Sequence, residues 1–404
     1  MAAVRYDERC NNVNIPKELI GLFGYMKQTV ILQVLPQMRT GGVERGTIEV
    51  AAAIVKAGKR AIVASAGGSM QTILAYSGGE HVTLPLTSKN PFTVLLDNVS
   101  ALQKVIKEYN VDIVHARSRA PAWSAYYAAK RTNTPFVTTF HGVYGLDPSI
   151  KKYYNAVMTK GDRVIAVSNF VAQHIKDNYD VHPSKLRIIH RGVDLNLFSP
   201  ERIKQQPMVD LATKWRIPDH LPLILMPGRI TRWKGQHVLV SALSKLQHRN
   251  YFCLLVGDDL GHPEYRKEIE KMITKLGLEG NIRIADNTTA MAEAYTLAEI
   301  VVAPSIEPEA FGRVPVEAQA MGRTVIAANH GGACETVIDG QTGWLVKPGD
   351  ADDLARVIDG VLHLSLEDKE NLRLNAMEHV RQNFSAQTMC DKTLQVYDEL
   401  ISKI

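Results

Sequence analysis

The stretch TVILQVLPQMRTGGVERGTIEVAAAIVKAGKRAIVAS, residues 29–65, decides the fold. Its first eight residues, 29–36, are short, apolar and β-branched, which indicates a buried strand. Two glycines then predict a turn, and the apolar residues from Val43 onward keep helical spacing. RAIVAS, at 60–65, is the next strand. A strand, a helix and a second continuous apolar strand are typical of a parallel sheet that helices cover on both faces.

The same alternation of strands and helices runs through the rest of the chain and is interrupted once. The stretch 195–220 is polar and contains prolines, so we interpret it as a linker. From about 351 onward the sequence is helical and amphipathic. We expect the further strands within 111–118, 134–142, 162–168, 186–194, 221–229, 251–259, 281–286, 298–305, 324–329 and 343–348.

The length of 404 residues exceeds what one ordinary core accommodates, so two domains are expected. We place the first at 1–200, with a polar leader at 1–28, and the second at 201–385. A final helix at 386–404 is expected to pack back toward the first domain. The predicted fold class is α/β, with two Rossmann-like, doubly wound domains facing each other. Such domains bind ligands in the cleft between them, at the carboxyl ends of their strands.

Composition favours a cytoplasmic protein. No apolar run approaches the roughly 18 residues that a membrane-spanning helix needs. The first residues carry charges where an export signal has its apolar segment. The cysteines are scattered, with no pair at metal-ligand spacing, and suit a reducing compartment. They are Cys10, Cys253, Cys334 and Cys390.

Charge is distributed unevenly between the two halves. Residues 1–200 contain 24 Lys and Arg against 14 Asp and Glu, a net charge of +10, whereas residues 201–404 contain 23 against 28, a net charge of −5. A basic first half suggests an anionic partner, either a membrane surface or a phosphorylated acceptor, and solvated surface charge is the alternative. Nucleic acid is not expected, because no dense basic run with interleaved aromatics occurs. The basic residues near aromatic ones are Arg117, Arg119, Lys130, Arg131, Lys151 and Lys152, close in sequence to Trp123, Tyr126, Tyr153 and Tyr154.

Two glycine- and arginine-containing turns follow strands that open the two halves. Gly41 and Gly42 let backbone approach a ligand, and the helix after them directs N–H groups at an anion. The turn lacks the GxGxxG pattern, and no acidic residue closes a strand about 20 residues later, which argues against a dehydrogenase. In PGRITRWKG, at 227–235, Arg229 and Lys234 suit the two phosphates of a diphosphate. A plain tight turn and a solvated basic loop are the alternatives.

The stretch EPEAFGRVPVE, residues 307–317, places two carboxylates after another strand end. Gly312 and Pro315 prevent one continuous helix through Glu309 and Glu317. Glu309 is therefore expected in a loop, and Glu317 near a helix N-terminus with Pro315 in the first turn. A glycoside hydrolase or phosphorylase that uses the two glutamates as acid and nucleophile is an alternative, which the interruption disfavours.

EAFGRVPVE resembles the E-x7-E motif of retaining glycosyltransferases with the GT-B fold, in glycosyltransferase family 4 (GT4, glycosyl transferases group 1). GGVER, FHG, PGRITRWKG, LVGDD and APSIEPEAFGRVPVEAQAMGRTVIAANHGGACETV occur in the order found in that family. The resemblance covers roughly 29–390 and is strongest over 223–346. One departure leaves the donor base open: IRIADNTTA stands where many relatives have an aromatic-Leu-Gly turn.

The resemblance implies a first domain that binds an acceptor and a second that binds a nucleotide-diphosphate sugar. Glu317 would accept hydrogen bonds from the ribose, and Glu309 would hold hydroxyls of the transferred sugar, helped by backbone N–H groups near Phe311 and Gly312. Arg229 and Lys234 would neutralise the diphosphate. Gly41 and Gly42 would admit the donor, and His141, at the end of the strand 134–140, would contact its sugar near the reacting carbon.

The expected function is transfer of a hexosyl group from a UDP- or GDP-sugar to a glycan or glycolipid acceptor. The resemblance implies retention by same-face attack, and we expect no metal ion, because Arg229 and Lys234 supply positive charge and no Asp-x-Asp ends a strand. No separate cofactor is expected. The basic first half suggests peripheral contact at the inner face of the membrane. The resemblance implies a role in cell-envelope or lipopolysaccharide biosynthesis, because relatives of this kind build cell-envelope glycans and glycolipids. A non-catalytic nucleotide-sugar binder is a further alternative.

Overall fold

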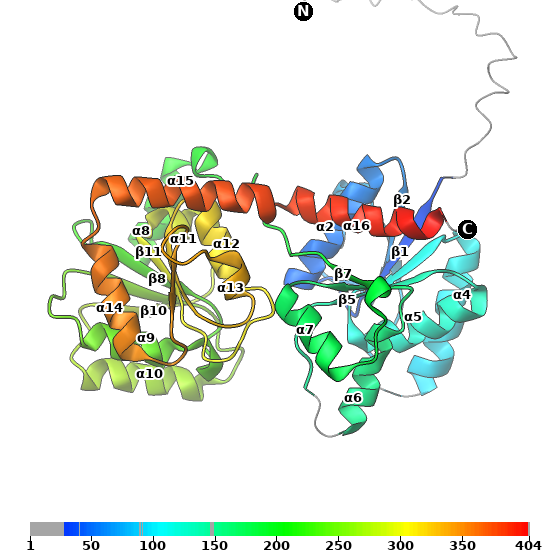
Figure 1. Cartoon of the computed structure of the whole chain (residues 1–404), viewed down its shortest axis with the longest axis horizontal. Coiled ribbons are helices and arrows are strands. Elements are labelled where there is room, and N and C mark those ends of the chain that lie inside the picture. The colour runs from blue at the N-terminus through cyan, green and yellow to red at the C-terminus, as the bar shows by residue number, and fades with distance from the viewer. Residues whose placement is uncertain (1–27, 40, 89, 91, 146–148, 403–404) are drawn as a thin grey trace, which may run out of the picture.

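The structure is a computed structural model that describes residues 28–39, 41–88, 90, 92–145 and 149–402. Two α/β domains lie side by side, and two long helices near the end of the chain run over both of them (Figure 1). The leader expected at 1–28 lies outside the described residues, except for Gln28. The predicted class of two doubly wound domains is confirmed by two sheets whose neighbouring strands are all parallel.

Within the described residues, the sheet of the first domain has seven strands in the order β3-β2-β1-β4-β5-β6-β7. The strands are β1 (Val30–Val34), β2 (Arg60–Ser65), β3 (Glu80–Thr83), β4 (Ile113–Ala116), β5 (Phe136–Phe140), β6 (Arg163–Ala166) and β7 (Leu186–Ile188). The helices are α2 (Gly42–Lys56), α3 (Gln71–Tyr76), α4 (Asn98–Glu108), α5 (Arg119–Thr132), α6 (Ser149–Asn155) and α7 (Asn169–Asn178). The shorter turns are η1 (Thr93–Asp97), η2 (Ala156–Thr159) and η3 (Pro183–Lys185).

The second sheet has six strands in the described part of the chain, ordered β10-β9-β8-β11-β12-β13. The strands are β8 (Leu223–Pro227), β9 (Phe252–Val256), β10 (Ile282–Ala285), β11 (Ile300–Ala303), β12 (Thr324–Ala328) and β13 (Trp344–Val346). The helices are α8 (Gln205–Trp215), α9 (Gln236–Ser244), α10 (Pro263–Lys275), α11 (Met291–Leu297), α12 (Arg313–Ala320), α13 (Ala333–Thr336), α14 (Ala351–Leu362) and α15 (Leu366–Asn383).

Strand order reverses once in each sheet, between β1 and β4 in the first and between β8 and β11 in the second. Loops leave the carboxyl ends of neighbouring strands in opposite directions at such a switch point, and the crevice between them is where doubly wound sheets bind ligands. The loops after β1, β4, β8 and β11 are therefore the places to look for a site.

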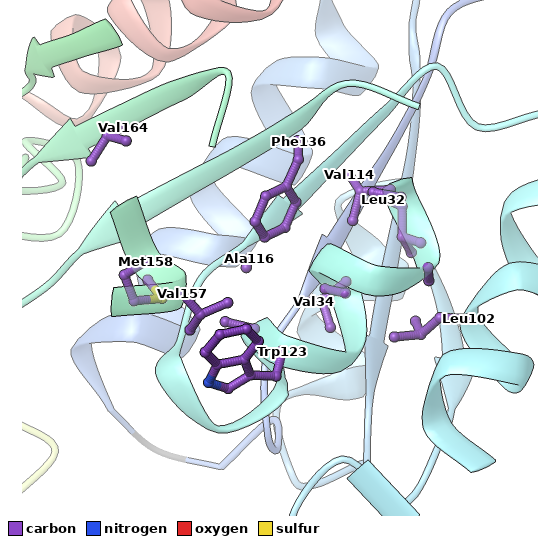
Figure 2. Close-up of a cluster of buried hydrophobic side chains, with 14 of the residues drawn as sticks. Leu32, Val34, Leu102, Val114, Ala116, Trp123, Phe136, Val157, Met158 and Val164 are labelled. Carbon is purple, nitrogen blue, oxygen red and sulfur yellow. The ribbon is translucent and has the colours of Figure 1, made fainter. Parts of the chain in front are cut away.

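Apolar side chains cover both faces of each sheet. Figure 2 shows one face of the first sheet, where side chains from its central strands pack against Trp123 of α5 and Leu102 of α4. Helices α2, α3 and α16 (Ala386–Ile401) cover the opposite face. In the second domain, α9, α10 and α14 cover one face, and α8, α11, α12 and α15 cover the other.

The stretch interpreted as a linker at 195–220 is wrong in part. It contains α8, whose Leu211 and Trp215 are buried in the core of the second domain. Val193 and Phe198 are buried in the same core, so the second domain begins several residues before the expected position 201. The error arose because only two side chains of α8 are buried, which leaves a mostly polar helix without a clear apolar stripe.

The chain crosses between the domains twice at one place. The N–H of Val193 donates to the carbonyl of Phe384, and the N–H of Ala386 donates to the carbonyl of Val193, each at 2.8 Å. A Cβ built on Gly192 would lie 2.4 Å from the Cα of Ala386, so only glycine permits this approach. α15 lies along the second domain, and α16 continues over α2 of the first (Figure 1).

Candidate active site between the domains

The carboxyl end of the second sheet carries three loops, 228–235, 304–312 and 329–332, which follow β8, β11 and β12. Gly235 has a φ of +84°, and a Cβ there would lie 2.1 Å from the carbonyl oxygen of Pro304. Glycine therefore allows the first two loops to touch through their backbones. Side chains on these loops are held in fixed relative positions.

Glu309 lies in the loop after β11, as predicted, and its carboxylate is already paired. The same oxygen, Oε1, accepts from Lys234 Nζ at 2.8 Å and from Ser305 Oγ at 2.6 Å. The Lys234 and Glu309 side chains are 13% and 23% exposed. The Lys234 ammonium also lies 4.5 Å from the centroid of the Trp233 ring. The loops thus bring a predicted phosphate-binding cation and a predicted sugar-binding carboxylate into direct contact.

Arg229 lies in the same loop as Lys234, and its side chain is exposed. Its guanidinium lies near the ring of Trp233, the residue before Lys234. Its guanidinium is 5.6 Å from the centroid of that ring, and none of the described carboxylates lies within 4 Å of it. Arg232 is exposed and pairs with Glu268 at 2.5 Å. Of the two arginines, Arg229 is the one left available to a ligand.

Glu317 lies in the second turn of α12 and has partners of its own. The helix begins at Arg313 after Gly312, whose φ is +81°, and Pro315 is in the first turn, as predicted. Arg313 donates to Glu317 Oε1 at 2.7 Å, and the Tyr295 hydroxyl donates to Oε2 at 3.0 Å. Burial, together with the neighbouring Glu317 carboxylate, raises the pKa of Tyr295 well above its usual value, which keeps the hydroxyl protonated as a donor.

Glu309 and Glu317 share no partner, so they do not form a paired acid and base. Each carboxylate is held by a different cation from a different element. The Phe311 side chain packs edge-to-face on Phe384 at a centroid distance of 5.7 Å. Its ring therefore belongs to the core, and the neighbouring Gly312 lines a small cavity of the second domain.

The first domain contributes the turn before α2. Gly41 has extended backbone, with a φ of 179°, and Gly42 is the first helical residue. A Cβ on Gly42 would lie 3.0 Å from Arg191 and 3.3 Å from Arg313. Arg191 also donates to the carbonyl of Gly42. Guanidinium groups from both domains thus cover the glycine turn that the sequence assigned to donor approach.

His141 follows β5, as expected, and both of its ring nitrogens are buried without a hydrogen-bond partner among the described residues. Burial lowers the pKa of His141 well below its usual value, and the charges of Arg191 and Arg117 lower it further. The imidazole is therefore neutral and can both donate and accept a hydrogen bond.

Four of the predicted site residues line two separate cavities in this structure. Glu309 and Gly312 line a small cavity of the second domain with Ser305 and His330. Gly42 and His141 line another cavity at the domain interface, together with Glu49, Arg117, Arg191 and Arg313. Arg117 was assigned to a basic surface, and this is wrong: it directly follows β4 and is 4% exposed. The strand-end rule that selected His141 would also have selected Arg117 and Arg191.

Glu335 of α13 joins the two domains and was not selected from the sequence. Its carboxylate accepts from the N–H groups of Asn169 and Phe170, both at 2.7 Å, and from His190 Nε2 at 2.8 Å. It therefore caps the N-terminus of α7 in the other domain. Burial raises the pKa of Glu335, but the hydrogen bonds from His190 and from the two N–H groups outweigh it, so that the pKa is lowered overall.

Two family models match the chain. The model described as glycosyl transferases group 1 matches residues 210–379, and the one described as glycosyltransferase family 4 matches residues 40–197. Among curated proteins, a D-inositol 3-phosphate glycosyltransferase of Jonesia denitrificans is 30% identical over 317 residues, which is 71% of each chain.

Solved structures agree with these matches. A glycosyltransferase from Rickettsia africae is 44% identical, with a TM-score of 0.86 over 93% of this chain and 99% of that one. Anabaena HepE, solved in complex with UDP-glucose, has a TM-score of 0.79 and 24% identity over 93% of this chain and 100% of HepE, a likeness that concerns the fold alone. No helix in the described ranges has the length and hydropathy to cross a bilayer.

Proposed function

The chain belongs to the glycosyl transferases group 1 family of enzymes with the GT-B fold, and on this premise we propose that it transfers a hexosyl group from a nucleotide-diphosphate sugar to a glycan or glycolipid. The contact between Lys234 and Glu309, at 2.8 Å, is the observation that carries the proposal. It joins a cation suited to a phosphate with a carboxylate suited to sugar hydroxyls at a switch point of the sheet.

We assign the donor-binding roles as follows. Arg229 and Lys234 bind the diphosphate, and Glu309 accepts hydrogen bonds from the transferred sugar. Glu317 accepts from the ribose. The backbone at Phe311 and Gly312 assists, while Gly41, Gly42 and His141 contact the donor from the first domain. Because HepE was solved with UDP-glucose, a UDP-sugar is the first donor to test, and a GDP-sugar is the second.

The proposed reaction retains the configuration of the transferred sugar. The bond between the anomeric carbon and the diphosphate oxygen breaks, the acceptor oxygen attacks from the same face, and the leaving phosphate takes the acceptor's proton. The carbon becomes oxocarbenium-like as charge builds on the departing oxygen. Arg229 and Lys234 meet that charge, so we propose that transfer needs no metal ion.

An aromatic groove of the first domain supports a glycan or glycolipid acceptor. Its volume is about 680 Å³, and Pro36 and Ala120 place it at the carboxyl ends of β1 and β4. Tyr153 stacks on Trp123 with ring centroids 5.7 Å apart. Tyr153 is 70% exposed, so it offers an apolar face to a sugar ring or to a lipid chain.

We propose peripheral contact with an anionic membrane at the cytoplasmic side, and with it a role in cell-envelope or lipopolysaccharide biosynthesis. Lys151 and Lys152 are exposed on α6 beside Tyr153 and supply the charge. Lys130 and Arg131 occupy the far end of α5 from Arg119, roughly 16 Å along the helix axis, and do not share this surface. Binding to anionic vesicles should weaken as salt rises, whereas no binding at low salt would contradict membrane contact.

A donor screen tests the proposed function. The full chain is melted with UDP-, GDP- and ADP-sugars, and the nucleotide sugar that raises the melting temperature is then incubated with acceptors, with and without EDTA. We expect nucleotide release coupled to a product with the donor's anomeric configuration, unaffected by EDTA. Hydrolysis of simple glycosides or sugar phosphates would instead favour a hydrolase or phosphorylase. Stable donor binding without any turnover would favour a non-catalytic binder.

A further inference from the structure

Three guanidinium groups meet in the cavity at the domain interface. Arg117 follows β4, Arg191 follows β7, and Arg313 begins α12. Glu49 of α2 and the unpartnered imidazole of His141 line the same cavity. Arg313 is the one lining side chain from the second domain.

Negative charge in the cavity does not balance these cations. Arg313 pairs with Glu317, which lies on its own helix. Within the described residues, no carboxylate lies within ion-pair distance of Arg117 or Arg191, and Arg117 Nε is buried without any hydrogen-bond partner. Glu49 is the one carboxylate among the described residues that line the cavity, and it faces more than one guanidinium. Burial raises its pKa, with partial compensation from Arg313 and Arg191. Burying unpaired cations destabilises a fold unless an anion binds there.

We propose that Arg117 and Arg191 form the first domain's half of the substrate site and bind a phosphate group of a substrate. Guanidinium forks match phosphate oxygens, and the 15-residue helix α2 begins at Gly42 with free N–H groups at the same place. The neutral imidazole of His141 adds an N–H group that can donate a hydrogen bond to a phosphate oxygen. The inference rests on the proposed function, because it assigns a phosphate-bearing substrate to the same cleft.

The phosphate has two possible sources, which share this chemistry. One is the donor diphosphate, in which case Arg117 and Arg191 stabilise the charge that the leaving oxygen gains when its bond to the anomeric carbon breaks. The other is a phosphate on the acceptor, which the two arginines would position without taking part in the bond changes. The cavity holds about 20 Å³, room for one water, so phosphate entry requires Arg313 to move away with the second domain.

Calorimetry on the full chain separates these cases with three probes: pyrophosphate, UDP and glucose 6-phosphate. The variants are Arg191→Gln and Arg117→Met, and Arg381→Gln is the control, because Arg381 is exposed and pairs with Glu378 on α15. Loss of one charge-assisted contact should weaken binding about ten- to hundredfold in both variants and leave the control unchanged. Weaker binding of pyrophosphate and UDP identifies the donor diphosphate, and weaker binding of glucose 6-phosphate alone identifies the acceptor phosphate.

Unchanged binding of all three probes in both variants would overturn the proposal. The wild type provides a test without substitution: phosphate should raise its melting temperature above that in chloride of equal ionic strength, and the absence of any rise would also count against the site. Arg191→Lys replaces the glutamine variant should that variant fail to fold. Sugar transfer by the wild type is measured separately, so that a failed anion site and a failed transferase assignment give different results.

Discussion

The two domains differ in whether the charged side chains at their shared cleft are paired. In the second domain, Lys234 contacts Glu309 at 2.8 Å and Arg313 contacts Glu317 at 2.7 Å. In the first, Arg117 is buried and Arg191 is half-buried, and neither has a carboxylate partner in the described chain. Paired charges hold side chains in place before the substrate arrives, whereas unpaired buried charges gain most when a ligand binds. The second domain is thus preorganised, and the first is completed by its substrate.

The largest expected effect is the loss of activity when Glu309→Gln breaks the ion pair between Lys234 and Glu309. The amide keeps the size of the side chain but loses the negative charge that holds Lys234 and that, in the proposed role, strengthens hydrogen bonds from the sugar hydroxyls. We expect kcat to fall about 100- to 1000-fold, the range found for removal of one electrostatic contact in a transition state. Nucleotide affinity, measured by calorimetry, should change little.

The matched control for that variant is Glu307→Gln, because Glu307 is exposed two positions earlier in the same loop. It should transfer sugar at the parent rate. If Glu309→Gln transfers sugar as fast as the parent, Glu309 does not bind the transferred sugar. The ion pair between Lys234 and Glu309 would then have a structural role only.

The next largest effect concerns the carboxylate that joins the two domains. Glu335→Gln weakens the cap on α7 and removes the charge facing His190. We expect a loss of about 1–2 kcal/mol of stability at neutral pH, with faster amide exchange in the first turn of α7. Urea unfolding and hydrogen exchange measure the two effects. Glu279→Gln, at an exposed position, should show neither.

The sign of the pH dependence follows from the lowered pKa of Glu335. A carboxyl with a folded pKa below its ordinary value of 4.5 contributes stability above 4.5 and loses it as pH falls through the folded pKa. The wild type's advantage over Glu335→Gln should therefore be full at neutral pH and shrink below 4.5. An advantage that persists unchanged in strong acid would mean that another contact holds the domains together.

The fold could be predicted because its signals are local. Apolar runs such as that of β1 and β8 are buried at every position, and the helices that follow them carry regular apolar spacing. β3 was not predicted because none of its four residues is fully buried, so it lacks the apolar run of a central strand. α8 was not predicted for a similar reason, because only Leu211 and Trp215 of this helix are buried.

The site could be predicted only where a residue follows a strand within one domain. Arg229, Lys234, Glu309 and His141 satisfy that rule and lie at the carboxyl ends of their sheets. Contacts across the domains could not be predicted, since the approach of Arg313 to the turn at Gly42 depends on how the domains sit together. Glu335 meets Asn169 across 166 positions of sequence, a pairing that no local pattern encodes.

A smaller effect sharpens the comparison within the second domain. Glu317→Gln removes one charge-assisted acceptor while Tyr295 can still donate to the amide oxygen. If Glu317 accepts from the ribose, nucleoside diphosphate affinity should fall about tenfold. Calorimetry with the nucleotide found in the donor screen measures it. Glu299→Gln, which loses a contact with Lys369 on the outer side of the domain, is the control. Unchanged affinity in Glu317→Gln would refute the ribose assignment.

The smallest expected effect is the loss of stability when an ion pair far from the cleft is removed, where α16 packs on the first domain. Glu399 accepts from Arg163 at 2.8 Å and Arg187 at 2.7 Å, and hydrogen bonds from Arg187, partly opposed by desolvation, lower its pKa to about 2. The carboxylate is 36% exposed, so solvent screening limits Glu399→Gln to a loss of about 0.5 kcal/mol at neutral pH. The stability that Glu399 contributes is fully present above pH 4.5 and disappears as the pH falls toward 2, because the pKa of Glu399 is lower in the folded protein than in the unfolded chain. Urea unfolding at pH 7 and pH 3 measures the difference. A loss as large as that of Glu335→Gln would mean that α16 depends on this ion pair more than on its buried apolar face.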